Sequence, residues 1–435
     1  MNGDVAERSG AAGSPEPDPE GAPTEEAQGD GRTPAEADLP LIISVDDHVM
    51  EPKDLWQREL PASMRDRGPK VVTERVKLEF VGGHYGFTRD VPDGDWCDLW
   101  IFDDLVTPTG LLHAPAGMPR DEQRNVPAIY DDFRPGTYDQ TERLADMDLN
   151  HVEAAINYPN IFPRFAGQGF LEREDKDLAL ACLRIYNDWM IDEWCGGAGQ
   201  GRLIPLTLVP LWDPALAAEE LRRCAEKGSH AIAFSENPSK LGVPSMYTGD
   251  WDVLWAAAEE TDTTVSMHIG SSSSMPSTSP DAPLATSMSL YAQNAQGSLA
   301  DWVFSGTLER FSDLKIAYAE SQVGWMPFQL ERMDAVWADG RGGVGGPVLP
   351  SEQVKGRVYG CVFDDLHGLK CRDDVGVDMI LFETDYPHSD GTFPHSRKIA
   401  HELFVAAGMD AEDCRKVLRT NAIEAYGLDR FGLTA

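Results

Sequence analysis

The sequence predicts an α/β protein built as a (β/α)8 barrel of the TIM type, with a small β-rich insert after the first strand. Two features predict this fold. Eight short apolar segments alternate with amphipathic ones along 435 residues, a length that suits one large domain of this class. Three of the apolar segments, far apart in the chain, end in His or Asp, and parallel strands closed into a barrel would bring these ends together.

The first strand is expected in the segment LIISVDDHVMEP, Leu41 to Pro52. Its apolar run ends in Asp46-x-His48, and side chains two residues apart on a strand point to the same side. One carboxylate and one imidazole would then project together from the carboxyl end of the strand, as a pair of metal ligands. Because a D-x-H pair is common by chance, the alternative for this segment alone is a turn with a surface histidine.

Two later segments have the same form. TTVSMHIGSSSS, residues 263–274, is an alternating run that ends in His268. MILFETDYPHSD, residues 379–390, is an apolar run that ends in Asp385, with His388 three residues behind. Two imidazole nitrogens and two carboxylate oxygens suit a divalent metal between zinc and a harder ion. We therefore expect one ion bound by Asp46, His48, His268 and Asp385.

The remaining elements follow from hydrophobic periodicity. Further strands are expected at 152–157, 203–210, 230–234, 315–319, 358–363 and 379–384. Helices are expected at 140–150, 175–195, 214–228, 251–261 and 410–428. For the third of these helices, Pro214 in the first turn and Gly228 at the end are the usual start and stop signals. The alternation of these strands and helices is typical of the barrel.

Two regions lie outside this alternation. Residues 70–125 alternate apolar and polar side chains between glycine turns, which predicts a β-hairpin or small sheet. Since this insert leaves the first strand at its carboxyl end, we expect it to cap the site, with His84 and His113 as mobile surface side chains. Residues 1–38 lack large apolar groups and predict a disordered acidic tail, which leaves 39–430 for the barrel.

Composition excludes several classes of partner. The formal net charge is −36, which disfavours nucleic acid and anionic membranes as partners. The chain has seven cysteines without C-x-x-C spacing and lacks a run of about 18 apolar residues or a secretory signal. We therefore expect a cytoplasmic protein with reduced thiols that acts on a small molecule, and we expect a homo-oligomer, a dimer.

Several side chains are placed to complete a pocket. Glu236 and Asn237 follow the fourth strand, and Arg164, after the second, could clamp a substrate carboxylate, although a structural role is the alternative. His388 could move a proton or merely orient the loop of Asp385. Aromatic lining or core could come from Trp96, Trp100, Phe102, Tyr158, Phe162 and Trp325.

With these motifs in place, residues 41–428 resemble the amidohydrolase superfamily, in the branch of aminocarboxymuconate-semialdehyde decarboxylase and the resorcylate-type decarboxylases (amidohydrolase family 2). The resemblance implies one metal on Asp46, His48, His268 and Asp385, with zinc expected and manganese or iron as alternatives. Asp46 departs from the commoner H-x-H pair but stays anionic. The family's catalytic histidine after the sixth strand is replaced by Glu320 or Ser321, depending on one gap.

Three functions are compatible with this pattern. The first is hydrolysis by metal-activated water, with Asp385 as ligand and general base. The alternative is non-oxidative decarboxylation of an aromatic or unsaturated acid, in which Glu320 with a raised pKa could serve as the acid. The third is an inactive barrel used as a binding protein. Loss of the sixth-strand histidine favours hydrolysis, because that histidine supports proton delivery in the decarboxylases.

Overall fold

The computed structural model describes residues 32–81, 84–340 and 342–435 of the chain. In these ranges, parallel strands form two sheets, with strand orders β1-β6-β7 and β13-β12-β11-β10-β9-β8. The bounds of these strands are β1 (Ile42–Val49), β6 (Val152–Pro159), β7 (Leu203–Pro205), β8 (Thr207–Leu208), β9 (Ala231–Phe234), β10 (Thr264–His268), β11 (Ile316–Ala319), β12 (Val358–Val362) and β13 (Ile380–Phe382).

The two parallel sheets adjoin at both ends. Leu206 alone separates β7 from β8, so the predicted strand 203–210 is present but interrupted. At the other end, just past β13, the backbone N–H of Asp385 donates to the carbonyl of Asp46 at 3.0 Å. The sequence-predicted strands at 152–157, 230–234 and 358–363 each match an observed strand to within two residues. The chain is thus an α/β protein with parallel sheets, as predicted.

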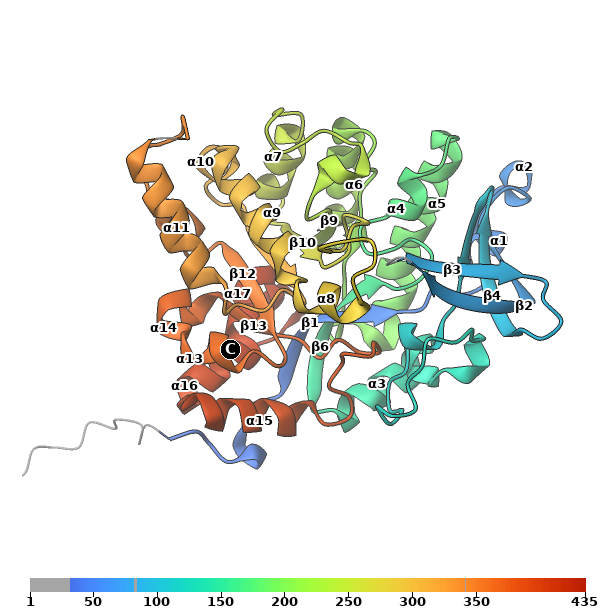
Figure 1. The fold of residues 1–435 in the computed structure, drawn as a ribbon, viewed down its shortest axis with the longest axis horizontal. Helices are drawn as coiled ribbons and strands as arrows, with labels where there is room; N and C mark the ends of the chain where they lie inside the picture. Colours follow the sequence, from blue (N-terminus) through green and yellow to red (C-terminus); the bar gives the residue numbers. More distant parts are fainter. Residues whose placement is uncertain (1–31, 82–83, 341) are drawn as a thin grey trace, which may run out of the picture.

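Helices surround these strands (Figure 1). Their bounds are α1 (Leu55–Glu59), α2 (Ala62–Arg65), α3 (Gln140–Leu149), α4 (Gln168–Leu171), α5 (Lys176–Trp189), α6 (Pro214–Glu226), α7 (Asp252–Glu260), α8 (Leu284–Ser289), α9 (Ala292–Phe304), α10 (Thr307–Arg310), α11 (Met326–Asp339), α12 (Pro350–Val354), α13 (Leu366–Lys370), α14 (Arg372–Val375), α15 (Ser396–Ala407), α16 (Ala411–Arg415) and α17 (Asn421–Tyr426). The predicted terminal helix is divided into α16 and α17 by a π-helical turn at Lys416–Thr420. Among the described residues, none of the helices is long and apolar enough to cross a membrane.

An antiparallel sheet occupies part of the predicted insert. Its strands pair in the order β3-β2-β4-β5 and lie beside α1 and α2 at the right of Figure 1. Their bounds are β2 (Lys70–Val81), β3 (His84–Arg89), β4 (Asp95–Phe102) and β5 (Leu105–Pro108). From β4, the Trp100 ring packs against Trp56 and Phe162, with centroids 5.3 and 5.4 Å away. Phe162 belongs to the loop after β6, so this sheet is tied to the carboxyl end of that strand.

The predicted acidic tail is only partly described. Residues 1–31 lie outside the described ranges, as does the side chain of His84. Residues 32–38 include a short 3-10 helix at Glu36–Asp38, and the Thr33 hydroxyl donates to the Met409 carbonyl at 2.6 Å. The core of the protein contains five almost fully buried tryptophans: Trp56, Trp100, Trp251, Trp255 and Trp302.

Candidate metal centre

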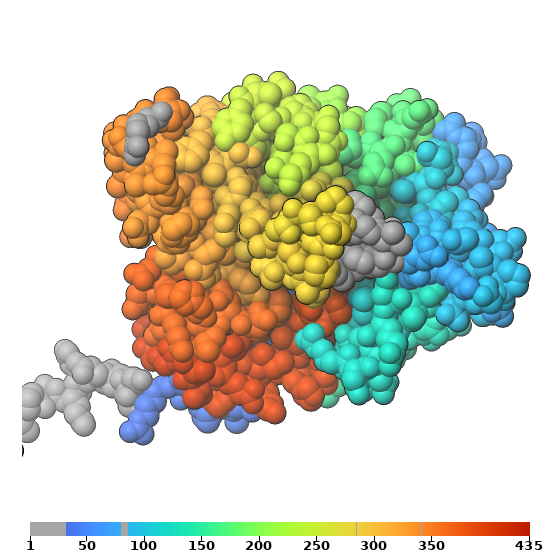
Figure 2. All heavy atoms as spheres, in the orientation of Figure 1, coloured from blue at the N-terminus to red at the C-terminus, as the bar shows by residue number. Residues whose placement is uncertain are grey.

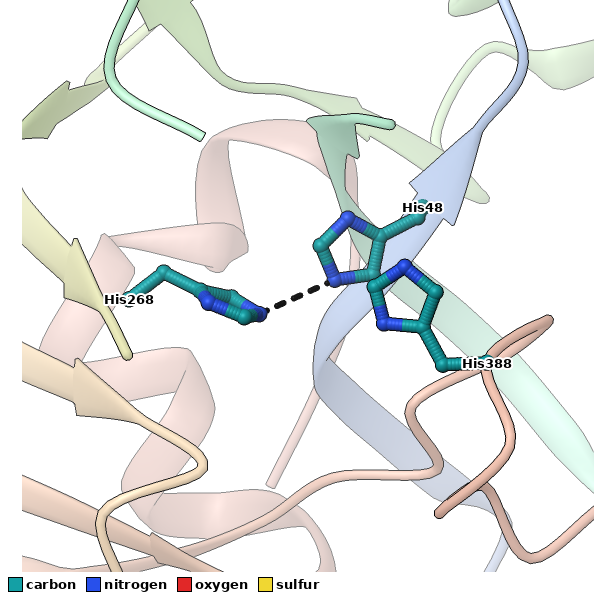
Figure 3. A group of neighbouring side chains, drawn as sticks. All are labelled: His48, His268 and His388. Atoms are coloured by element: carbon teal, nitrogen blue, oxygen red, sulfur yellow. Dashed lines mark hydrogen bonds between the residues drawn. The ribbon is translucent and has the colours of Figure 1, made fainter. Parts of the chain in front are cut away.

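Two histidines face each other where β1 and β10 end. His48 Nε2 and His268 Nε2 lie 3.1 Å apart, and Figure 3 shows the two rings pointing toward each other. The other ring nitrogens contact backbone carbonyls, His48 Nδ1 at 3.0 Å from Pro159 O and His268 Nδ1 at 2.6 Å from Ile269 O. A carbonyl only accepts, so each Nδ1 carries a proton, and in the neutral rings both Nε2 lone pairs point into the same space. Lone pairs at this distance repel unless a cation or a proton lies between them.

Two buried aspartates complete this donor set. Asp46 Oδ1 lies 3.2 Å from His48 Nε2 and Asp46 Oδ2 lies 3.3 Å from His268 Nε2. Asp385 Oδ1 lies 3.7 Å from His48 Nε2. Within the described residues, no oxygen of either carboxylate has a hydrogen-bond partner, although both side chains are fully buried. Donors about 2.1 Å from one centre at tetrahedral angles lie about 3.4 Å apart, so this spacing fits a divalent cation.

The electrostatics of Asp46, Asp385 and His48 also favour a cation. Burial raises the pKa of Asp385 well above its ordinary value, and the neighbouring charge of Asp46 raises it further. Burial would do the same to Asp46, but His268 and His48 hold the pKa of Asp46 well below its ordinary range. Burial and the nearby His388 lower the pKa of His48 to about 3, which keeps it neutral and available as a ligand.

Glu320 and His388 lie at the more open edge of this centre. Glu320 directly follows β11, and its Oε2 lies 3.7 Å from His268 Nε2. His388 Nδ1 lies 2.9 Å from Asp385 Oδ1, and its ring centroid is 3.8 Å from that of His48 (Figure 3). The two side chains are 15% and 13% exposed, whereas the four predicted ligands are at most 2% exposed. Substrate would therefore meet Glu320 and His388 first.

The two acids expected to handle protons have unusual backbone conformations. Glu320 has a φ angle of 54° and Asp385 one of 49°, both in the left-handed region that L-residues seldom adopt. Burial and the charge of Asp385 raise the pKa of Glu320 well above its ordinary value. Strained backbone of this kind persists where the surrounding structure fixes it, and such residues cluster at active sites.

Glu236 and Tyr158, both predicted to line the pocket, lie near the candidate ligands, Glu236 against the loop after His268 and Tyr158 beside both histidine rings. Glu236 Oε1 accepts from Gly270 N at 3.2 Å, Ser272 Oγ at 2.9 Å and Asn294 Nδ2 at 2.8 Å. Glu236 thereby holds the loop that follows His268. The Tyr158 ring centroid lies 5.6 Å from that of His48 and 5.5 Å from that of His268.

Asn237 and Arg164 make other contacts. Asn237 Oδ1 accepts from the hydroxyl of Ser239 at 2.7 Å and caps the short helix that follows. The Arg164 guanidinium donates to Glu172 Oε1 at 2.8 Å and to Ser273 Oγ at 2.6 Å. A substrate carboxylate would have to displace one of these acceptors to reach Arg164, so its predicted role as a clamp stays a prediction.

An aromatic ring that the sequence analysis did not single out contacts the site. Phe165 packs on His268 with ring centroids 4.0 Å apart and an interplanar angle of 30°, and its centroid lies 5.3 Å from that of His48. Of the aromatics named from sequence, Trp100, Phe102 and Phe162 belong to the hydrophobic core, while Trp96 is 53% exposed. The only sequence signal for Phe165 was its place in the loop after a predicted strand.

His113 also differs from the sequence-based expectation. The expectation of a surface side chain is wrong, because His113 is half-buried and its Nδ1 accepts from Gly110 N at 3.0 Å. Its carbonyl accepts from Asn160 Nδ2 at 3.0 Å, which ties the predicted insert to the loop after β6. Burial and the nearby His388 lower the pKa of His113 to about 4.

Three further buried charged groups hold the site's loops. Asp47 accepts from Thr384 Oγ1 at 2.6 Å and thereby joins β1 to the segment before Asp385. Glu51 accepts from the backbone N–H groups of residues 160–162 after β6. Arg143, fully buried, donates to the carbonyl of His48 and lies over the Tyr386 ring at 4.3 Å. Such polar groups must pair when buried, and here their partners are the loops that carry the ligands.

The fold and this site define an α/β protein with a candidate divalent-metal centre at the carboxyl ends of its parallel strands. The chain belongs to the amidohydrolase family, whose model, described as Amidohydrolase, matches residues 111–428. This confirms the resemblance inferred from the motifs.

Individual relatives extend the comparison. A gamma-resorcylate decarboxylase of Rhodococcus jostii (strain RHA1) is 25% identical over 344 residues, which cover 68% of this chain and 93% of the relative. An amidohydrolase of Mycobacterium avium subsp. paratuberculosis K-10 has a TM-score of 0.63 at 22% identity, covering 89% of this chain and 99% of that one. A 5-carboxyvanillate decarboxylase of Novosphingobium aromaticivorans DSM 12444 has a TM-score of 0.57 at 18% identity, and the match covers 92% of this chain and 99% of that one. The last two comparisons concern the fold.

Proposed function

We propose that this protein is a metal-dependent, non-oxidative decarboxylase of an aromatic acid. The observation that carries the proposal is the similarity to gamma-resorcylate decarboxylase, which extends over 93% of that enzyme. Of the alternatives open from sequence, this one has better support than hydrolysis. The absence of a histidine after the sixth strand favours hydrolysis, but Glu320, 3.7 Å from His268 Nε2, could supply the proton that decarboxylation requires.

The metal would be held by Asp46, His48, His268 and Asp385. Supporting this are the facing Nε2 atoms and the four buried carboxylate oxygens without hydrogen-bond partners in the described structure. When bound, the ion supplies positive charge that polarises a substrate oxygen. The Novosphingobium decarboxylase structure is complexed with manganese and 4-hydroxy-3-methoxy-5-nitrobenzoic acid, so manganese joins zinc as a candidate for this chain.

The side chains of the site then have distinct tasks. Decarboxylation breaks the bond between the ring carbon and its carboxylate, releases CO2 and leaves the electron pair on the ring carbon. Glu320 would give its proton to that carbon, so that the product is the arene. His388, which contacts Asp385 and stacks on His48, would orient the substrate or return the proton to Glu320. Phe165 would lie against the aromatic ring of the substrate.

The architecture proposed with this function is a closed (β/α)8 barrel within residues 39–430, capped by residues 70–125. Support for closure comes from the adjoining ends of the two parallel sheets, at Leu206 and between Asp46 and Asp385. Support for a cap comes from the contact of Asn160 with His113 and from the segment around residues 115–123, which lies against the loop of His388.

The experiment is an assay of CO2 release by the manganese- or zinc-loaded protein from γ-resorcylate and other hydroxybenzoates. The proposal predicts CO2 in equal amounts to the decarboxylated arene, and loss of both in Glu320→Gln with metal content retained. Hydrolysis of ester or amide substrates without any CO2 release would support the hydrolase alternative instead. Purified protein without stoichiometric metal would favour an inactive binding protein.

A further inference from the structure

A cavity of about 400 Å³ lies directly outside the metal centre. It is formed between the segment around residues 115–123 and the loop 386–399. His388 belongs to both regions, since its ring lines the cavity while its Nδ1 lies 2.9 Å from Asp385. In Figure 2 the turquoise segment that contains residues 115–123 adjoins the red C-terminal part of the chain. The volume is within the range of small-molecule sites, about 300–1,000 Å³.

The lining of this cavity differs in composition from the acidic protein as a whole. The chain has 73 acidic against 37 basic residues, yet the described residues that line the cavity include no Asp or Glu. Its polar lining contains the guanidinium of Arg120, the amide of Gln123 and the imidazoles of His388 and His395. In a protein this acidic, a lining that contains no carboxylate and offers Arg120 together with further hydrogen-bond donors favours an anion.

Arg120 is available to such an anion. Its Nη1 lies 3.7 Å from Asp390 Oδ1, and the two side chains are 67% and 37% exposed. An exposed ion pair at this distance is weak, because solvent screens it and ordering two side chains costs entropy. A ligand carboxylate can therefore replace Asp390 and accept two parallel hydrogen bonds from the guanidinium.

We propose that this cavity binds the part of the substrate that lies away from the metal, and that the substrate is an aromatic acid with a second anionic group. The inference rests on the proposed function and specifies its substrate class. The reacting carboxylate would lie on the metal side of His388, and the second anionic group would bind Arg120 beside Gln123. The apolar lining of Met118 and Phe393 would contact the ring between them.

Calorimetric binding to the metal-loaded protein tests this directly. The probes are isophthalate and terephthalate, which place a second carboxylate at two distances, and benzoate, which has none. Wild type should bind at least one of the two dicarboxylates about tenfold or more tightly than benzoate. Arg120→Gln should abolish that preference and change benzoate affinity by less than about twofold. Asp390→Asn should tighten dicarboxylate binding, because it frees Arg120.

Arg124→Gln is the matched control. Arg124 is exposed, lies four residues further along and does not line the cavity, so the same loss of charge should leave the dicarboxylate preference intact. The inference would be overturned if Arg120→Gln bound the dicarboxylates as tightly as wild type does, or if Arg124→Gln lost dicarboxylate affinity to the same extent as Arg120→Gln. It would also be overturned if wild type bound neither dicarboxylate more tightly than benzoate. Binding needs no turnover, so an Arg120-dependent preference without CO2 release would refute the proposed reaction alone. CO2 release without the preference would refute only the role of the cavity.

Discussion

Asp385→Asn should abolish the effect of metal on stability while leaving the metal-free protein nearly unchanged. Burial and the charge of Asp46 raise the pKa of Asp385 well above its ordinary value, which favours the neutral acid over the carboxylate in the metal-free protein. Asparagine has the shape of that neutral acid and buries no charge. The same substitution removes an anionic ligand from a fully buried position, where Asp385 Oδ1 lies 2.9 Å from His388 Nδ1 and 3.7 Å from His48 Nε2.

The magnitude follows from linkage. A metal present at about 1,000 times its dissociation constant stabilises the folded state by about 4 kcal/mol. With roughly 400 folded residues and about 2.1 cal/mol/K of unfolding entropy per residue, 4 kcal/mol raises the melting temperature by about 5 °C. Wild type should therefore lose about 5 °C on treatment with a chelator and recover it with manganese or zinc, whereas Asp385→Asn should melt at the temperature of the metal-free wild type under both conditions.

Melting curves with and without chelator, together with metal content by mass spectrometry, provide the measurement. Asp47→Asn is the matched control, because Asp47 is equally buried but accepts from Thr384 and Ser44 rather than facing the histidines. It should melt at a lower temperature overall and keep the metal-dependent shift. One metal ion per chain in Asp385→Asn, with the 5 °C shift intact, would refute the assignment of Asp385 as a ligand.

Three further variants test the other groups. His388→Asn should lower turnover by about 10² or more with metal content unchanged. The control variant His401→Asn, on α15, should leave turnover unchanged. Turnover in His388→Asn above about a third of the wild-type value would exclude proton transfer by His388. Glu320→Gln should lower turnover by about 10²–10⁴, whereas Glu331→Gln, a change of the same kind at an exposed position, should not lower it. Equal turnover in Glu320→Gln and wild type would show that Glu320 is not the acid. Burial raises the pKa of Glu51 to about 7, so the folded state holds this proton above the unfolded pKa of 4.5. The stability that Glu51 contributes is therefore fully present below pH 4.5 and is lost as pH rises through 7, with the free energy of unfolding falling by up to about 1.4 kcal/mol per pH unit. Denaturant titrations of Glu51→Gln at several pH values should show that this part of the pH dependence is gone.

Sequence reasoning located the strands and the candidate ligands because both follow from local patterns. An apolar run that ends in Asp46-x-His48 predicts a strand and the direction of its last side chains without reference to the rest of the chain. His268 and Asp385 were found in the same way. Their convergence required only that the strands be parallel, and the alternation of strands and helices supplied that.

The residues that were missed depend on contacts between segments far apart in the chain. Asp47 lies between the two candidate ligands of β1, but its partner Thr384 is 337 positions away. Phe165 contacts His268 only because the loop after β6 folds over the end of β10, and periodicity carries no information about loop paths. Likewise, His113 is half-buried because the insert packs on Asn160, a contact that hydrophobic patterns do not encode.

The fate of solvent atoms in turnover tests the decarboxylase proposal most directly. The metal-loaded protein is incubated with a converted hydroxybenzoate in D2O and, separately, in water labelled with oxygen-18, and the products are analysed by mass spectrometry and NMR. Delivery of an exchangeable proton from Glu320 predicts one deuterium at the carbon that lost CO2, and no oxygen-18 in the arene. A product without a new carbon–deuterium bond at the carbon that carried the carboxylate would contradict decarboxylation by proton delivery to the ring.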